Sequence, residues 1–214
     1  MMRTRWSLGI IPLLVSLALA GCSMVGEASI HIPTVTPASP DEPVWAQLER
    51  RPVTVPRLAA GAPCPITPYQ AVPPPPNTGP DSLDFTGRGE GPVYLEVGGV
   101  SGILEYAAPS FWHSQDWGGG NANFAEHAPN NNYVLIRGHQ LDGPYQLRIG
   151  EGDFPPLEYR MDPTPWAEPT GWIGAGVYPR VRAPGCYAFQ IDGLNQVDGT
   201  SFSYLIVFHA QLAT

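Results

Sequence analysis

Residues 184–193, Pro-Gly-Cys-Tyr-Ala-Phe-Gln-Ile-Asp-Gly, carry the clearest strand pattern in this chain of 214 residues. Tyr187, Phe189 and Ile191 alternate with smaller or polar residues, as in an extended strand whose two faces meet different environments. A second apolar run, from Ser203 to His209, follows the Asp-Gly turn signal. Together the two runs predict a half-buried antiparallel pair of strands.

Short runs of the same type recur upstream and are separated by turn residues. The chain has 24 glycines and 26 prolines, and charged residues make up only 14%, so long helices are not expected. Gly98-Gly99 is a plausible tight hairpin between two of the runs. We expect further strands at 92–97, 102–106, 133–137, 145–149, 157–161 and 177–181. Residues 82–214 are therefore predicted to form a single, mainly β, antiparallel sandwich.

Residues 39–81 are predicted to hold one short helix and a proline-rich segment that wraps or spaces. Ser39 and Pro40 offer an N-cap and a first helical residue, and Pro52 ends the pattern. Trp45 and Leu48 fall on one face, where they pack on the domain or dock a partner. The prolines that follow recur too often for a central strand.

The N-terminus carries the pattern of a bacterial lipoprotein signal. An apolar run after two arginines ends in Leu19-Ala20-Gly21-Cys22, which resembles a lipoprotein processing site, so residues 1–21 are expected to be a signal peptide. Cys22 would then carry the lipid anchor, and residues 22–38 would form a disordered stalk. The expected location is the cell envelope, on the outer side of the cytoplasmic membrane or in the outer membrane. Ordinary secretion is the alternative, with Cys22 a free thiol.

The odd number of cysteines supports the lipid anchor. The chain has three cysteines, and lipidation of Cys22 leaves Cys64 and Cys186, which we expect to pair in an oxidising compartment. Closing a loop of that length stabilises a fold by at most about 4–5 kcal/mol in the chain-entropy account. The alternative is two buried free thiols.

The charge of the chain restricts its partners. The formal net charge is −8, and all eleven basic residues are arginine. Nucleic-acid binding is not expected, because a phosphate backbone requires clustered cations. Attachment to a membrane is expected only through acyl chains, not through a basic patch.

The Pro-Gly-Cys-Tyr-Ala-Phe-Gln-Ile-Asp-Gly stretch and the final strand resemble the closing strands of immunoglobulin-like bacterial domains, in which a Pro-Gly turn precedes a Tyr-x-Phe strand. With residues 51–56, 61–65 and 134–138, the chain is similar to a group of uncharacterised secreted proteins of high-GC bacteria. This resemblance implies an immunoglobulin-like sandwich and no assigned activity. Cys64 lies ahead of the expected first strands, and the Cys-Trp-Cys core pattern of antibody domains is absent, so the disulfide would pin the wrapping segment to the sandwich.

The sequence carries no catalytic motif that we can identify. It has no Gly-x-Ser-x-Gly, no Ser-x-x-Lys and no His-Glu-x-x-His, and its five histidines are scattered. We therefore predict no catalytic residue, no cofactor and no metal site. An exported hydrolase or lyase with clustered acidic and histidine side chains remains the alternative to a non-enzymatic role.

One segment, residues 111–132, is a candidate for recognition together with Tyr133, which follows it. Its aromatic side chains are interleaved with glycines and asparagines, and flat rings beside amides suit glycan binding. The alternative is that the aromatic residues simply cover the core. The candidate recognition residues are Trp112, Trp117, Asn121, Asn123 and Tyr133. The sequence thus predicts a lipid-anchored binding or structural module that contacts a glycan or an envelope protein. An accessory lipoprotein of a transporter or sensor is a further alternative.

Overall fold

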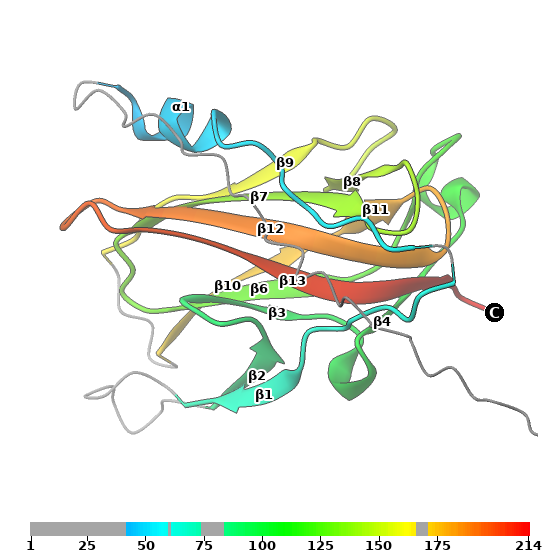
Figure 1. Ribbon diagram of the computed structural model, residues 1–214, viewed down its shortest axis with the longest axis horizontal. Helices are drawn as coiled ribbons and strands as arrows, with labels where there is room; N and C mark the ends of the chain where they lie inside the picture. The colour runs from blue at the N-terminus through cyan, green and yellow to red at the C-terminus, as the bar shows by residue number, and fades with distance from the viewer. Residues whose placement is uncertain (1–41, 60, 74–83, 166–170) are drawn as a thin grey trace, which may run out of the picture. The chain divides into compact units, whose positions relative to one another are not determined.

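The computed structural model describes residues 42–59, 61–73, 84–165 and 171–214. The expected signal peptide, the expected stalk and Cys22 lie outside the described residues. The described chain forms two β-sheets packed as a sandwich, with one short α-helix (Figure 1). The mainly β sandwich expected from the sequence is thereby confirmed.

The smaller sheet has five antiparallel strands in the order β1, β2, β3, β6 and β10. Strand β1 lies at its edge, where a proline-rich neighbourhood is tolerated because one side of the strand needs no ladder partner. The strand bounds are β1 Tyr69–Val72, β2 Phe85–Arg88, β3 Val93–Glu96, β6 Ala122–His127 and β10 Trp172–Val177.

The larger sheet has eight strands. Seven follow the order β4, β13, β12, β7, β8, β11 and β5, and β9 pairs with β7 outside that path. The pairing of β4 with β13 is parallel, a departure from the all-antiparallel expectation. The bounds are β4 Ile103–Tyr106, β5 Gly118–Gly119, β7 Asn132–Gln140, β8 Gln146–Ile149, β9 Glu158–Met161, β11 Pro179–Val181, β12 Gly185–Asn195 and β13 Ser201–Leu212.

Strand β12, which contains the stretch quoted at the outset, lies at the centre of the larger sheet. It pairs with β13 on one side and with β7 on the other. Tyr187, Phe189 and Ile191 enter the core between the sheets, as the alternation predicts. The opposite face is also buried, because Ala188 and Asp192 are fully covered. The strand is therefore buried on both faces rather than on one.

The second face of β12 is covered by the segment that follows the helix, residues 51–59 and 61–68, which we call the strap. Val55, Leu58 and Cys64 of the strap pack against Leu141 and Ala188. The strap is also held by the backbone, since Leu58 N donates to Leu141 O at 2.8 Å. The wrapping role expected for this part of the chain is thus seen in its contacts.

The helix α1, Val44–Glu49, is shorter than the sequence pattern predicts. The expected cap and first helical residue, Ser39 and Pro40, lie outside the described residues. Glu42 and Pro43 are not helical, and Pro43 has φ −55° and ψ 136°, so the helix begins at Val44. A proline also disfavours helical backbone at the residue before it. The helix packs on the domain through Leu48, which is fully buried.

The tight hairpin expected at Gly98-Gly99 is also wrong. Strand β3 and strand β4 belong to different sheets, and the 3-10 turn η1, Gly99–Ser101, connects them. Gly98 has φ 57°, and a Cβ there would lie 2.1 Å from the Ile103 carbonyl oxygen. The two glycines therefore serve a tight crossover between sheets: Gly98 has no room for a side chain, and Gly99 adopts a positive φ of 51°.

The single strand expected at 177–181 is likewise divided between the two sheets. Val177 ends β10 in the smaller sheet, and β11 begins at Pro179 in the larger one. The runs at 133–137, 145–149 and 157–161 correspond to β7, β8 and β9, and residues 203–209 lie within β13.

Candidate functional site

The structure distributes the five candidate recognition residues over the domain instead of gathering them. Trp112 and Trp117 lie close to each other, at the 3-10 turn η2, Pro109–Trp112, and just before β5. Asn121 lies in a shallow depression beside β4. Asn123 is on β6 and donates to Glu96 Oε2 at 3.2 Å, and Tyr133, at the start of β7, packs on Trp45.

Trp112 is half-buried and held on several sides. Its Nε1 donates to Gly119 O at 2.9 Å, and its ring lies 5.1 Å from the ring of Tyr178. The Arg180 guanidinium carbon lies 4.6 Å from the centre of the Trp112 ring, a cation–π arrangement. These contacts fix the indole in place.

Trp117 is 6% exposed and has two guanidinium groups over its ring. The Arg148 and Arg182 guanidinium carbons lie 5.1 and 4.6 Å from its ring. Arg182 also pairs with Asp116 at 3.0 Å. Trp117 therefore packs as the core-covering alternative expects and offers little surface to a ligand.

Arg180 of β11 is fully buried and clamps the two loops at this end of the sandwich. Its guanidinium donates to Trp117 O at 2.8 Å on one loop, and to Gly150 O and Gly152 O at 3.2 and 3.1 Å on the other. Burial lowers the pKa of the Arg180 guanidinium, but an arginine stays charged in proteins. A buried cation bound to carbonyls costs desolvation energy that only well-formed hydrogen bonds offset.

These two loops expose two phenylalanines, which we call the two-phenylalanine surface. Phe111 of η2 is 71% exposed and Phe154 of the β8–β9 loop is 89% exposed. Besides the Arg180 clamp, Ser114 Oγ lies 3.5 Å from Asp153 O across the two loops. The β8–β9 loop is also closed at its base, because Arg148 Nη1 donates to Pro155 O at 2.7 Å. Both rings are thus displayed by loops that internal contacts hold.

The sequence predictions named neither Arg180 nor Phe154. A buried arginine is unexpected from sequence, because arginine is rarely fully buried. Its hydrogen-bond partners lie 28 to 63 residues away along the chain, so no local sequence pattern predicts these contacts. The exposure of Phe154 could be predicted from the Phe-Pro-Pro run at 154–156, because an aromatic residue next to prolines in a turn does not belong to a strand that would place it in the core.

Glu126 of β6 is the buried carboxylate with a pKa near neutrality. It is 1% exposed, and burial raises its pKa from 4.5 to about 7, against the opposing effect of hydrogen bonds from Asn132 and Asn130. Asn130 Nδ2 donates to Glu126 Oε2 at 2.8 Å, and Thr164 N donates to Asn130 Oδ1 at 2.7 Å. The carboxylate therefore belongs to an amide network that fixes the loop between β6 and β7.

Asp192 forms a second buried network, at the strap. Its carboxylate accepts from Arg137 and from Gln190 at 2.8 Å each, and Arg51 Nη1 lies 4.0 Å away. Arg51 also donates to Phe202 O at 3.0 Å. This network attaches the start of the strap to β12 and its neighbours.

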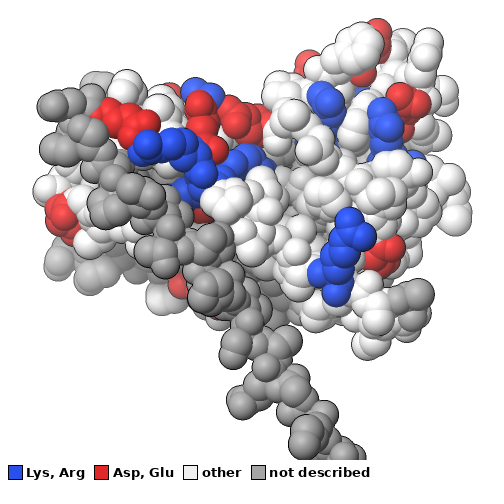
Figure 2. Space-filling model, turned by 45° about the horizontal axis from the view of Figure 1, so that its top comes forward, with Lys and Arg blue, Asp and Glu red and all other residues white. Residues whose placement is uncertain are grey.

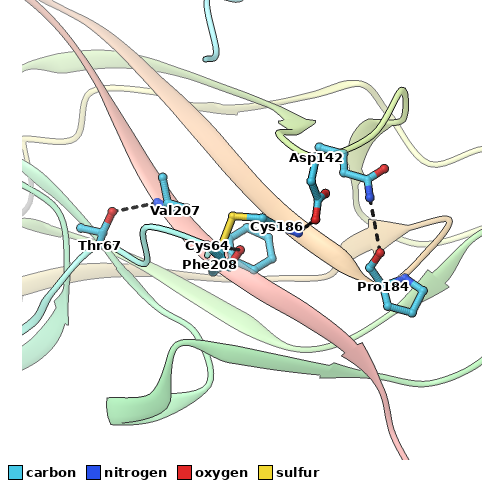
Figure 3. The surroundings of a disulfide bond; sticks show 8 residues. Cys64, Thr67, Asp142, Pro184, Cys186, Val207 and Phe208 are labelled. Carbon is cyan, nitrogen blue, oxygen red and sulfur yellow. Dashed lines mark hydrogen bonds between the residues drawn. A yellow bond between two sulfur atoms is a disulfide. The ribbon is translucent and has the colours of Figure 1, made fainter. Parts of the chain in front are cut away.

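The disulfide attaches the strap a second time. Cys64 and Cys186 are bonded, with Cα atoms 5.4 Å apart, so the predicted pairing is confirmed (Figure 3). Cys186 N donates to Asp142 Oδ2 at 3.0 Å, and Val207 N donates to Thr67 Oγ1 at 2.8 Å on the strap side. Such a bond persists in an oxidising compartment.

On the face drawn in Figure 2, basic and acidic side chains lie close to each other. Around α1, Arg50 pairs with Glu42, and Arg160 pairs with both Glu49 and Glu158. Exposed pairs of this kind contribute little stability, but they leave these arginines close to carboxylates.

In the described part of the chain, no group of three or more His, Cys, Asp or Glu side chains is placed to hold a metal ion. None of the helices described is long and apolar enough to span a membrane.

Comparisons with known proteins add little. No family model and no curated protein sequence matches the chain. Among solved structures, the CooA pilin subunit from enterotoxigenic Escherichia coli is weakly similar, with a TM-score of 0.34 and 11% sequence identity. The match covers 58% of this chain and 100% of the pilin chain. At this level of similarity, nothing about the pilin carries over to this protein.

Proposed function

We propose that this protein is a lipid-anchored component of the bacterial cell envelope and that its β-sandwich is a non-catalytic binding module for another envelope protein. The two-phenylalanine surface carries the proposal, because Phe111 and Phe154 are 71% and 89% exposed on clamped loops. The lipid anchor rests on the pattern ending in Cys22, and the disulfide agrees with a location outside the cytoplasm.

The clamp supports a binding role. Loops that recognise partners are positioned by a rigid scaffold, and order that exists before binding lowers the entropy cost of association. Arg180 contributes to that order by holding carbonyls of both loops. Burying a fully exposed phenylalanine contributes about 1.5–3 kcal/mol, so the two rings together offer up to about 3–6 kcal/mol to a partner.

The chemistry of the rings favours a protein partner over a glycan. Phenylalanine has no polar group at its tip, and a protein surface can offer apolar pockets to such anchors. Asp116 is paired with Arg182 at 3.0 Å, so these loops carry no unpaired basic cluster of the kind that attracts an anionic lipid surface. The partner is therefore expected to present apolar pockets.

Site-specific photo-crosslinking in the native host tests the proposal. A benzoylphenylalanine at position 111 or at position 154 of the full chain is expected to give an adduct with the same protein. Val197, which is 74% exposed on the turn between β12 and β13, is the matched control position and should give no such adduct.

A second substitution tests whether both phenylalanines contact the same partner. Phe154→Ser should abolish the adduct formed from position 111, whereas Val197→Ser should leave it unchanged. Different adducts from the two positions, the same adduct from position 197, or no adduct from either phenylalanine position would overturn the proposal.

A further inference from the structure

A shallow depression of about 390 Å³ lies beside β4, and neither Phe111 nor Phe154 lines it. Its polar side chains come from four parts of the chain: Ser101 from η1, Glu105 from β4, Gln211 from β13 and Asn121 from the residues before β6. Ile103 adds apolar surface, whereas the Leu104 side chain is buried in the core. The volume is near the lower end of the range of about 300–1,000 Å³ that small-molecule sites occupy.

The depression exists because the chain changes sheets at this point. Ala107 and Gly119 exchange two backbone hydrogen bonds, at 2.8 and 3.1 Å, which places β5 against the end of β4. Continued pairing would put Asn121 opposite Glu105, but the chain turns away and begins β6 in the other sheet. A Cβ on Gly120 would lie 2.8 Å from Glu105 O, so the chain passes β4 closely before it leaves.

This departure leaves hydrogen-bonding groups at the edge of β4. On the opposite edge, His209 N donates to Gly102 O and Ala213 N donates to Tyr106 O, the pattern of a parallel ladder. In such a ladder successive residues direct their backbone groups to alternate sides. The backbone N–H and C=O of Glu105 therefore face the depression rather than β13.

The side chains of the depression are also available. Glu105 and Asn121 are exposed, and the carboxamide of Asn121 makes no hydrogen bond to any other residue that the structure describes. Gln211 Nε2 lies 3.4 Å from Glu105 Oε1, a weak contact that holds both groups at the rim. Ser101 is occupied, since its Oγ donates to Gly98 O at 2.7 Å and accepts from Ile103 N at 3.2 Å.

We propose that this depression binds a neutral sugar unit of a glycan. Two carboxamides and one carboxylate offer both donors and acceptors, as the hydroxyls of a sugar require. No basic side chain is among the lining residues, so an anionic ligand has no counter-charge there. The apolar surface of the partly exposed Ile103 suits the C–H face of a pyranose ring. This site is independent of the two-phenylalanine surface.

Saturation-transfer NMR on the full chain with Cys22→Ala tests the proposal. The probes are the methyl glycosides of glucose, galactose, mannose and N-acetylglucosamine, together with arginine methyl ester as a cationic competitor. We expect transfer to at least one glycoside with an affinity in the millimolar range. Transfer to arginine methyl ester alone, or to none of the probes, would overturn the proposal.

Matched variants locate the binding. Glu105→Gln and Asn121→Ala are each expected to weaken the glycoside about tenfold, a factor that corresponds to about 1.4 kcal/mol. The controls are Glu96→Gln and Asn123→Ala, which alter the same residue types on neighbouring strands. An equal effect of the controls would place the sugar elsewhere and refute the site.

Discussion

Glu126 should make the stability of this domain depend on pH near neutrality. The carboxylate is 1% exposed, and its hydrogen-bond donors are the neutral amides Asn130 and Asn132. None of its described hydrogen-bond partners is a cation. Ionisation therefore places an uncompensated negative charge in the interior, and burial raises the pKa of Glu126 from 4.5 to about 7.

The sign and size of the effect follow from proton linkage. Below pH 4.5 both the folded and the unfolded chain hold the proton, so the full stability is present. Between pH 4.5 and about 7 the unfolded chain has released the proton while the folded chain keeps it, and stability falls as the pH rises. The difference between the two pKa values corresponds to about 3 kcal/mol in the free energy of unfolding.

Urea denaturation from pH 5 to pH 8 measures this effect when wild type is compared with Glu126→Gln. The variant cannot ionise, so its stability should lose about 2–3 kcal/mol less over that interval, whatever the fixed cost of the substitution. Glu90→Gln, at an exposed carboxylate, is the control and should follow wild type. Parallel curves for wild type and Glu126→Gln would refute the reasoning and would mean that the two amide donors cancel the cost of desolvation.

Three further outcomes are expected. Replacing Cys64 and Cys186 together by alanine should lower the free energy of unfolding by up to about 5 kcal/mol in urea, since the bond closes 122 residues; a loss under about 1 kcal/mol would contradict the entropy account. Arg180→Met should cost about 2–4 kcal/mol and speed amide exchange in both clamped loops, whereas Arg182→Met, at an exposed arginine, should do neither. Cys22→Ala should move the protein from the membrane fraction to the soluble fraction; retention with membranes would disprove the lipid anchor.

The sequence predicts best those elements whose pattern is long and alternating. β12 and β13 have 11 and 12 residues, enough for the period of two to be unmistakable. β1 and β2 have four residues each, and β6 includes Asn123 and Glu126, so none of the three stands out from a loop. Their assignment depends on neighbouring strands that come from distant parts of the chain.

The errors at turns have a common physical cause. Gly98-Gly99 matches a hairpin signal, yet the same positive φ values serve a crossover between sheets. The local residues specify a sharp turn, and tertiary packing decides which sheet receives the next strand. The break at Tyr178, between β10 and β11, has the same origin.

The sequence predicts the disulfide correctly, but it predicts β12 wrongly as a half-buried strand, because β12 is buried on both faces. Counting cysteines requires no knowledge of what covers a sheet, so Cys64 and Cys186 could be paired in advance. Gln190 and Asp192 look solvent-facing in the sequence, but Gln190 Nε2 donates to Pro52 O at 3.0 Å, and the Asp192 carboxylate lies 4.0 Å from Arg51 Nη1. Polar residues at these positions bind the strap instead of water.

The strap also relates the proposed tether to the proposed binding surface. The described chain enters through α1, where Trp45 packs 5.3 Å from Tyr133 at the start of β7. The clamped loops are held separately, by Arg180 of β11. None of the hydrogen bonds and ion pairs that residues 42–68 make with the rest of the described chain involves either clamped loop. The entering chain and the proposed binding surface therefore use different parts of the sandwich, which is the arrangement that a tethered binding module requires.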